Sequence, residues 1–257
     1  MAITTRSSFI YGHTITDDNA YINFMEDGIT ELTAIIDVGS YTISQFVDKV
    51  AIALNEVGDS TYTVTLDRDT RKITITADAN FDLLVTTGTQ AGISAFSLIG
   101  FTTDRSSALT YEGDTASGSI YYPQYNLQEY VSFEDIEEAV QSKVNESSSG
   151  EIEVVSYGTR NFSEFNIKYA TDITGQGAID NNATGVSDLR AFMQYITKKR
   201  PIEFLPDKSD TNIFYSTLLE STSTSKDGTG FTLKELYSQK LANYFETGKL
   251  VFRKLII

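Results

Sequence analysis

His13 is the only histidine in the chain, so it is the only imidazole that could exchange protons near neutral pH. No serine or carboxylate stands at a spacing that would assign it to this histidine as a catalytic partner. We therefore interpret His13 as an ordinary strand or turn residue. The chain also lacks cysteine, which excludes disulfides, thiolate metal sites and a cysteine nucleophile.

Two stretches contain fragments of ion-binding or phosphate-binding motifs. Asp67 and Asp69 have the D-x-D spacing of a cation site, but a calcium loop needs more oxygen ligands and a late glutamate, which favours a solvated turn. The loop 174–186 contains Gly175, Gly177 and Gly185. It lacks the Lys-Ser/Thr ending of a P-loop and the dinucleotide fingerprint. We predict no metal and no cofactor, and this loop is either an interaction loop or a plain connection.

Short charged runs are the other candidates for chemistry. The adjacent acidic pairs are Asp17-Asp18, Glu26-Asp27 and Glu137-Glu138. Neighbouring strand residues point to opposite faces, and the last pair falls in the first turn of a predicted helix, so solvated charge is the default interpretation. The basic run Lys198-Lys199-Arg200 ends another predicted helix, where cations suit the helix dipole. A contact with an acidic neighbour is the alternative.

Aromatic residues are abundant, with fifteen tyrosines, fifteen phenylalanines and no tryptophan. They could line a glycan groove, but sugar-stacking platforms favour tryptophan, whereas tyrosine is also common on sheet faces and subunit interfaces. Four tyrosines stand close together at Tyr121, Tyr122, Tyr125 and Tyr130. We interpret this cluster as part of an interface.

Net charge limits the classes of partner. The 257 residues carry a formal charge of −15, a balance that repels phosphate backbones and argues against nucleic-acid binding. The N-terminus has no secretory signal pattern, and no run approaches the ~18 apolar residues of a membrane span, so we expect a product assembled in the cytoplasm. Residues 1–120 hold 6 basic and 16 acidic side chains, and residues 121–257 hold 14 and 19. This difference and the length favour two domains with a boundary near residue 120.

The first predicted domain, residues 1–120, alternates strand and helix signals. Residues 9–37 read as two or three strands, and Thr42 with Gln45 forms a capping box before an apolar stripe that predicts a helix over 43–57. Residues 61–77 read as a hairpin with a turn at Asp67–Thr70. Residues 81–85 predict a further strand, and 94–101 a short apolar segment.

The second predicted domain, residues 121–257, has more helical signals. We predict helices over 133–144, after a Ser132 cap, from a Ser187 cap to just before Pro201, and over 233–245, after a Thr232 cap. The predicted strands are 151–158, 163–171, 202–205, 212–222 and a terminal strand from residue 249, the first two forming a hairpin. The expected fold class is α+β, with two mostly antiparallel sheets that each carry one or two packed helices.

Residues 9–118 resemble a module of structural proteins from tailed bacteriophages. The resembling pieces are the strand YINFMEDGITELTAII, GSYT opening a helix, the hairpin YTVTLDRDTRKITITA, and SLIGF before a Ser/Gly-rich exit. The resemblance implies a virion component of the tail, the head–tail junction or the baseplate, assembled in the host cytoplasm and without enzymatic activity. It also implies partners: other copies of this chain in a homo-oligomeric ring, and neighbouring virion proteins.

Two other function classes stay open on the sequence. A host-recognition fibre or adhesin module predicts a concave aromatic groove that binds glycans. A hydrolase predicts two carboxylates converging in one pocket, about 5 to 10 Å apart.

Overall fold

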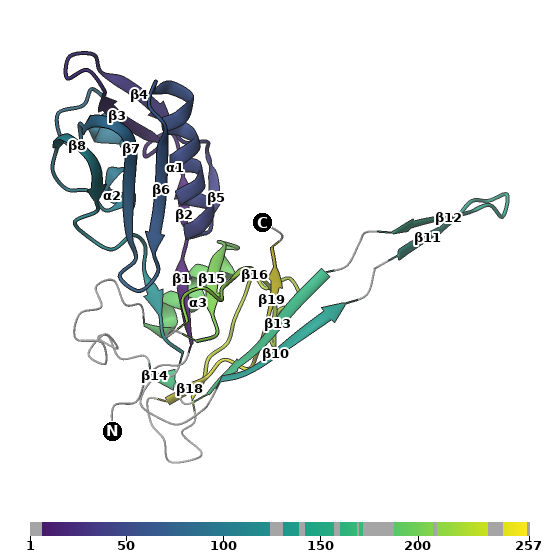
Figure 1. Ribbon diagram of the computed structural model, residues 1–257. Helices are drawn as coiled ribbons and strands as arrows, with labels where there is room; N and C mark the ends of the chain where they lie inside the picture. The colour runs from purple at the N-terminus through teal and green to yellow at the C-terminus, as the bar shows by residue number, and fades with distance from the viewer. Residues whose placement is uncertain are drawn as a thin grey trace.

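The structure is a computed structural model that describes residues 7–123, 131–138, 142–156, 160–168, 170–171, 188–207, 210–235 and 244–255. For 131–138, 142–144, 153–156 and 170–171 the description is of the backbone alone. The fold is α+β and mostly antiparallel, as the sequence predicts. Figure 1 shows a lobe, a sheet below it and a long hairpin that projects from the sheet.

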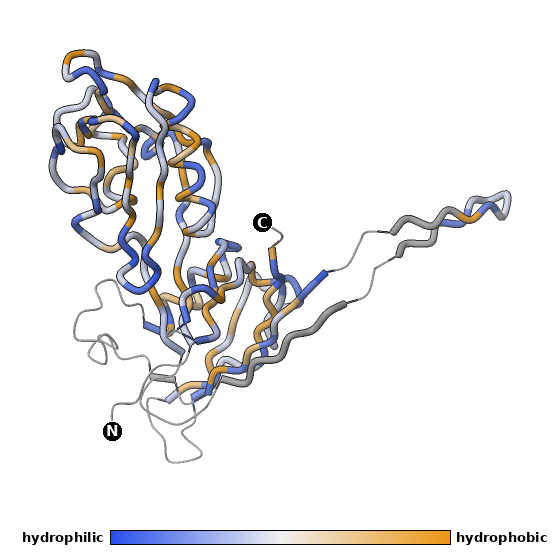
Figure 2. Tube along the Cα trace, in the orientation of Figure 1, coloured by the Kyte–Doolittle hydropathy of each residue, from blue (hydrophilic) through white to orange (hydrophobic). Residues whose placement is uncertain are grey.

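The lobe, residues 13–117, contains a five-stranded sheet covered by a helix. Its strand order is β4 (Leu32–Ile35), β3 (Tyr21–Met25), β7 (Lys72–Leu83) and β6 (Tyr62–Asp67), and β8 (Arg105–Glu112) also pairs with β7. A two-stranded sheet joins β2 (His13–Ile15) to β5 (Gly39–Tyr41). The helix is α1 (Ile43–Val57), and η1 (Ala91–Ile93) and α2 (Phe96–Ile99) precede β8. Hydrophobic residues recur along these strands and helices (Figure 2).

Helix α1 begins and ends where its sequence signals place it. The Thr42 hydroxyl accepts a hydrogen bond from the Gln45 amide, and the Gln45 side chain accepts one from the Thr42 amide, which completes the capping box. Phe46, Val50 and Leu54 are fully buried on one face. The predicted helix over 43–57 is confirmed, and its buried face packs in the same core as the β6–β7 hairpin.

The body sheet is the seven-stranded sheet below the lobe. Its order is β10 (Val131–Glu138), β13 (Arg160–Ile167), β19 (Lys249–Lys254), β16 (Tyr215–Thr222), β15 (Ile202–Leu205), β1 (Ser8–Tyr11) and β9 (Ile120–Tyr121), all antiparallel. A small sheet contains β14 (Ala170–Thr171), β18 (Tyr244–Glu246) and β17 (Lys234–Glu235). The chain leaves the body sheet after β1, forms the lobe and returns to the sheet at β9. In this sheet β1, from residues 1–120, pairs with β15, from residues 121–257.

Aromatic packing forms the core on one face of the body sheet. The Phe9 ring lies 4.9 to 5.8 Å from the rings of four phenylalanines, which are Phe165, Phe192, Phe204 and Phe252. Phe192 belongs to α3 (Leu189–Thr197), whose predicted apolar stripe is fully buried. The cap of α3 is Asp188 and not Ser187, because the Asp188 carboxylate accepts the Ala191 amide at 2.7 Å.

The projecting hairpin, called the arm below, spans residues 142–156. Strands β10 and β13 pair from Val131 opposite Ile167 to Glu138 opposite Arg160. The pairing of β11 (Ser142–Glu146) with β12 (Ile152–Ser156) starts four residues further along each strand, with Ser142 opposite Ser156. The two pairings therefore follow one register. Figure 1 shows β11 and β12 projecting away from the body sheet.

Several sequence predictions for the second half are wrong. The predicted helix over 133–144 is strand at 131–138 and 142–146, because eight registered pairs with β13 outweigh a helix preference of a few tenths of a kcal/mol per residue. Residues 152–156 pair with β11 and not with 163–171. The predicted helix over 233–245 is strand at 234–235 and 244–245, and the stretch between lies outside the described residues. The predicted strand at 81–85 is the end of β7.

Candidate functional site

His13, the only candidate proton shuttle, is buried against residues of the lobe. Its Nε2 lies 2.8 Å from the Ser117 hydroxyl, which itself donates to the Leu98 carbonyl at 2.6 Å. The ring lies 4.6 Å from the Phe46 ring. Burial lowers the pKa of His13 from 6.5 to about 4, so the imidazole is neutral in the folded chain at neutral pH. These contacts give His13 a packing role.

The buried, neutral His13 predicts loss of stability in weak acid. Below pH 6.5 the unfolded chain binds a proton at this histidine that the folded chain does not bind until about pH 4. The free energy of unfolding should therefore fall between pH 6.5 and 4, by roughly 3 kcal/mol at 1.36 kcal/mol per unit of pKa shift. Urea unfolding at pH 7, 6, 5 and 4 measures the decrease. His13→Gln should remove most of it, and an unchanged pH profile in that variant would contradict the assignment.

The two D-x-D carboxylates stabilise a turn. Asp67 accepts the Asp69 amide at 2.9 Å and the Thr70 amide at 3.4 Å, and these bonds hold the β6–β7 turn. Among the described residues there is no group of three or more histidine, aspartate or glutamate side chains that could hold a metal ion. The glycine loop 174–186 lies outside the described residues.

The acidic pairs do not converge in a pocket where the structure describes them. Asp17 and Asp18 are exposed in a turn, whereas Glu26 accepts the Asp59 and Ser60 amides and the Tyr62 hydroxyl at 2.9 Å. Asp27 accepts the backbone amides of its own loop, which lowers the pKa of its carboxyl to about 2. Glu26 and Asp27 therefore cap loops, and Glu137-Glu138 lies on β10, of which the backbone alone is described.

The interface interpretation of the tyrosine cluster is wrong for its described members. Tyr121 is fully buried and stacks on Phe192, with ring centroids 4.3 Å apart. Tyr122 is buried with Ile10 and Leu205 on the other face of the body sheet. Tyr125 and Tyr130 lie outside the described residues. The aromatic excess of this chain therefore fills its core.

The arm is the strongest candidate for a functional surface. A two-stranded ribbon is at best marginally stable in water, because it has no second layer to bury its side chains. Near the tip Ile152 is 67% exposed, the second largest exposure among the large hydrophobic side chains of the described residues. The β11–β12 contacts given by the structure are with each other.

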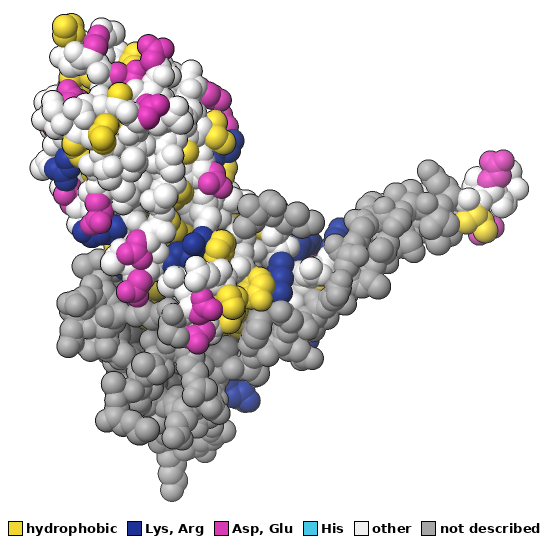
Figure 3. Space-filling model, viewed as in Figure 1, with side chains coloured by type: hydrophobic (Ala, Val, Ile, Leu, Met, Phe, Trp, Pro, Cys, Tyr) yellow, Lys and Arg dark blue, Asp and Glu magenta, His cyan; other side chains and the backbone are white. Residues whose placement is uncertain are grey.

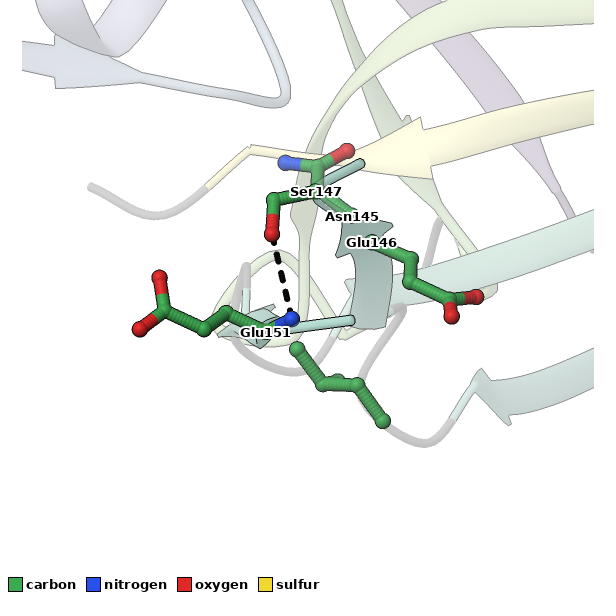
Figure 4. Close-up of a pocket in the computed structure, with 5 residues that line it drawn as sticks. Asn145, Glu146, Ser147 and Glu151 are labelled. Atoms are coloured by element: carbon green, nitrogen blue, oxygen red, sulfur yellow. Dashed lines mark hydrogen bonds between the residues drawn. The ribbon is translucent and has the colours of Figure 1, made fainter. Parts of the chain in front are cut away.

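The arm tip, residues 145–152, is polar apart from Ile152. The tip closes through the Ser147 hydroxyl, which accepts the Glu151 amide at 3.1 Å. In the close-up of this open hollow, the carboxylates of Glu146 and Glu151 point away from each other (Figure 4). They do not form the convergent pair that glycoside hydrolysis requires.

A buried ion pair fixes the lobe on the body sheet that carries the arm. Glu203 of β15 is fully buried, accepts the Ser44 amide in the first turn of α1 at 2.8 Å, and lies 3.2 Å from the Arg68 guanidinium. The positive end of the helix dipole favours a carboxylate at this position. The Arg68 guanidinium also lies 3.6 Å from the centre of the Phe214 ring. Because Ser44 and Arg68 belong to the lobe, this cluster positions the lobe.

The two segments that connect the lobe to the sheet are held by further buried groups. Arg71 donates to the Gly118 carbonyl at 2.9 Å, and the Tyr195 hydroxyl donates to the Gly12 carbonyl at 3.0 Å. A Cβ at Gly12 would lie 1.9 Å from the Tyr41 carbonyl oxygen, so only glycine fits there. The connection is therefore a packed joint between the lobe and the body sheet.

The basic run at the end of α3 is only partly used inside the chain. Lys199 donates to the Leu219 carbonyl at 2.6 Å and the Glu220 carbonyl at 3.1 Å. Lys198 is exposed, and the Arg200 guanidinium lies 5.5 Å from the Tyr195 ring centre. Lys199 is thus used in hydrogen bonds within the chain, and the other two cations lie at the surface.

Sequence reasoning missed the arm and the buried ion pair of Glu203. It predicted helix where the arm begins, and it did not single out Glu203. The glutamate carried one usable signal: in Ile-Glu-Phe-Leu it shares a strand face with Leu205, so both faces of β15 had to be covered.

Comparison with known proteins does not identify the chain. No family model matches the sequence, and no curated protein matches it. Among the described residues, no helix combines the length and the apolar character needed to cross a bilayer.

Proposed function

We propose that this chain is a structural component of a bacteriophage virion, placed in the tail, the head–tail junction or the baseplate. It acts through subunit–subunit contacts with copies of itself in a ring and with neighbouring virion proteins. The resemblance of residues 9–118 to phage structural modules supports the virion assignment. The projecting arm is the observation that carries the assembly role.

The arm favours assembly over catalysis for a physical reason. A two-stranded ribbon has no second layer of its own to cover its faces, which gives little stability to a lone molecule. A neighbouring subunit that packs against it supplies the missing layer. Edge strands that are not covered in the monomer are common sites of such pairing.

Mass measurement and particle analysis test this function. Mass photometry and analytical ultracentrifugation of the purified chain from 10 nM to 100 μM should show a concentration-dependent species of several copies. Mass spectrometry of purified particles from the producing culture should detect the chain at many copies per particle. A chain that is absent from particles and that turns over a substrate would contradict the proposal.

A further inference from the structure

We propose that the arm of one copy docks on a second copy of this chain, with its tip against the basic corner at the end of α3. The basic corner is defined as Lys198, Lys199 and Arg200. This inference rests on the proposed function, because it names the surfaces through which the copies would assemble.

Charge complementarity supports this pair of surfaces. The arm, residues 142–156, holds 3 acidic and 1 basic side chains, whereas residues 168–257 hold 10 acidic and 12 basic ones. The chain thus combines an acidic arm with a C-terminal part of slight positive charge. Opposite potentials across an interface steer association and fix its register.

The tip presents the groups that such a contact needs. Glu146 and Glu151 are exposed, and their carboxylates extend to opposite sides of the ribbon (Figure 4). Ile152 lies beside Glu151 and is 67% exposed, so it can add apolar contact area. Acidic and hydrophobic side chains appear together at the end of the arm in the space-filling view (Figure 3).

The basic corner presents two cations to the surface. Lys198 caps α3 and is exposed, and Arg200 follows two residues later. The Lys199 ammonium is held by two backbone carbonyls, which keeps the turn rigid between them. A guanidinium and an ammonium at this spacing can each meet one carboxylate of the tip.

The position of the arm favours a second copy as the partner. Figure 1 shows β11 and β12 well away from α3 of the same chain, so the tip does not contact its own basic corner. A contact between two different surfaces of identical chains is heterologous, and it generates a ring when the rotation closes.

Charge reversal on each surface, and on both together, tests the docking. The arm variant is Glu146→Lys with Glu151→Lys, and the corner variant is Lys198→Glu with Arg200→Glu. Each variant alone should raise the dissociation constant of the assembly at least about tenfold by sedimentation velocity in 50 mM salt. Combining all four substitutions in one chain should restore it to within about threefold. Asp17→Lys with Asp18→Lys, in an exposed turn of the lobe, is the control for added positive charge.

The outcomes separate this inference from the proposed function. A wild-type assembly that is unaffected by both charge reversals would overturn the docking but not the structural role. Weakening by each reversal without restoration in the combined variant would also overturn the docking. A chain that stays monomeric up to 100 μM overturns docking between copies, whereas the virion role falls only if the chain is absent from particles as well.

Discussion

Excising residues 139–159 is expected to abolish assembly while the lobe and body sheet stay folded. The variant joins Glu138 to Arg160, which are paired across β10 and β13, through a four-residue Gly-Asn-Gly-Ser linker. The excised part contains β11 and β12, whose given contacts are with each other, so little of either core is touched. The surface that we propose to dock on a neighbour is removed.

Sedimentation velocity and thermal unfolding measure the two halves of this expectation. The dissociation constant should rise at least a hundredfold, about 2.7 kcal/mol, whereas the melting temperature should change by less than about 3 °C. The matched control shortens only the tip, with Ser147–Gly150 replaced by Asn-Gly, which keeps Glu146, Glu151 and Ile152. An excised variant that assembles like the wild type would show that the arm is not an interaction surface.

Local signals predicted the lobe better than the rest of the fold. Helix α1 is specified within its own segment by the Thr42–Gln45 capping box and a stripe from Phe46 to Leu54, and the β6–β7 hairpin by alternation on both sides of a short polar turn. Because these signals and the resulting structures lie within about twenty residues of each other, sequence reading could find them.

The arm and the joint depend on partners far away in the chain, so the sequence did not predict them. Residues 133–144 have apolar residues at helical spacing, yet their first part is strand because β13, about thirty residues later, offers a paired backbone. The pairing with β13 outweighs a weak local preference for helix. Glu203 meets its partners only because helix α1 and the β6–β7 turn of the lobe bring residues 44 and 68 to it. The spacing of these residues in the sequence does not predict this contact.

The largest single-residue effect on stability is expected at Glu203. Glu203→Ala removes a carboxylate that is fully buried, leaves the Ser44 amide without its acceptor and leaves Arg68, whose side chain is 17% exposed, without its counter-ion. Removing one partner of a buried ion pair costs about 3–5 kcal/mol, most of it from the charge left behind. Glu203→Gln keeps the shape and one acceptor oxygen, so it should cost less than the alanine variant.

Urea unfolding of both variants, followed by circular dichroism and tyrosine fluorescence, measures these losses. Glu220→Ala is the matched control, because Glu220 pairs with Arg253 at 2.7 Å but both side chains are about one-third exposed, and such pairs contribute about 1 kcal/mol or less. Hydrogen exchange should show faster opening of the first turn of α1 in Glu203→Ala than in the control. If Glu203→Ala costs no more than Glu220→Ala, the lobe is held by the small apolar cluster of Ile10, Ile43 and Leu205 instead. The ion pair would then set only the direction of the lobe on a joint held together by packing.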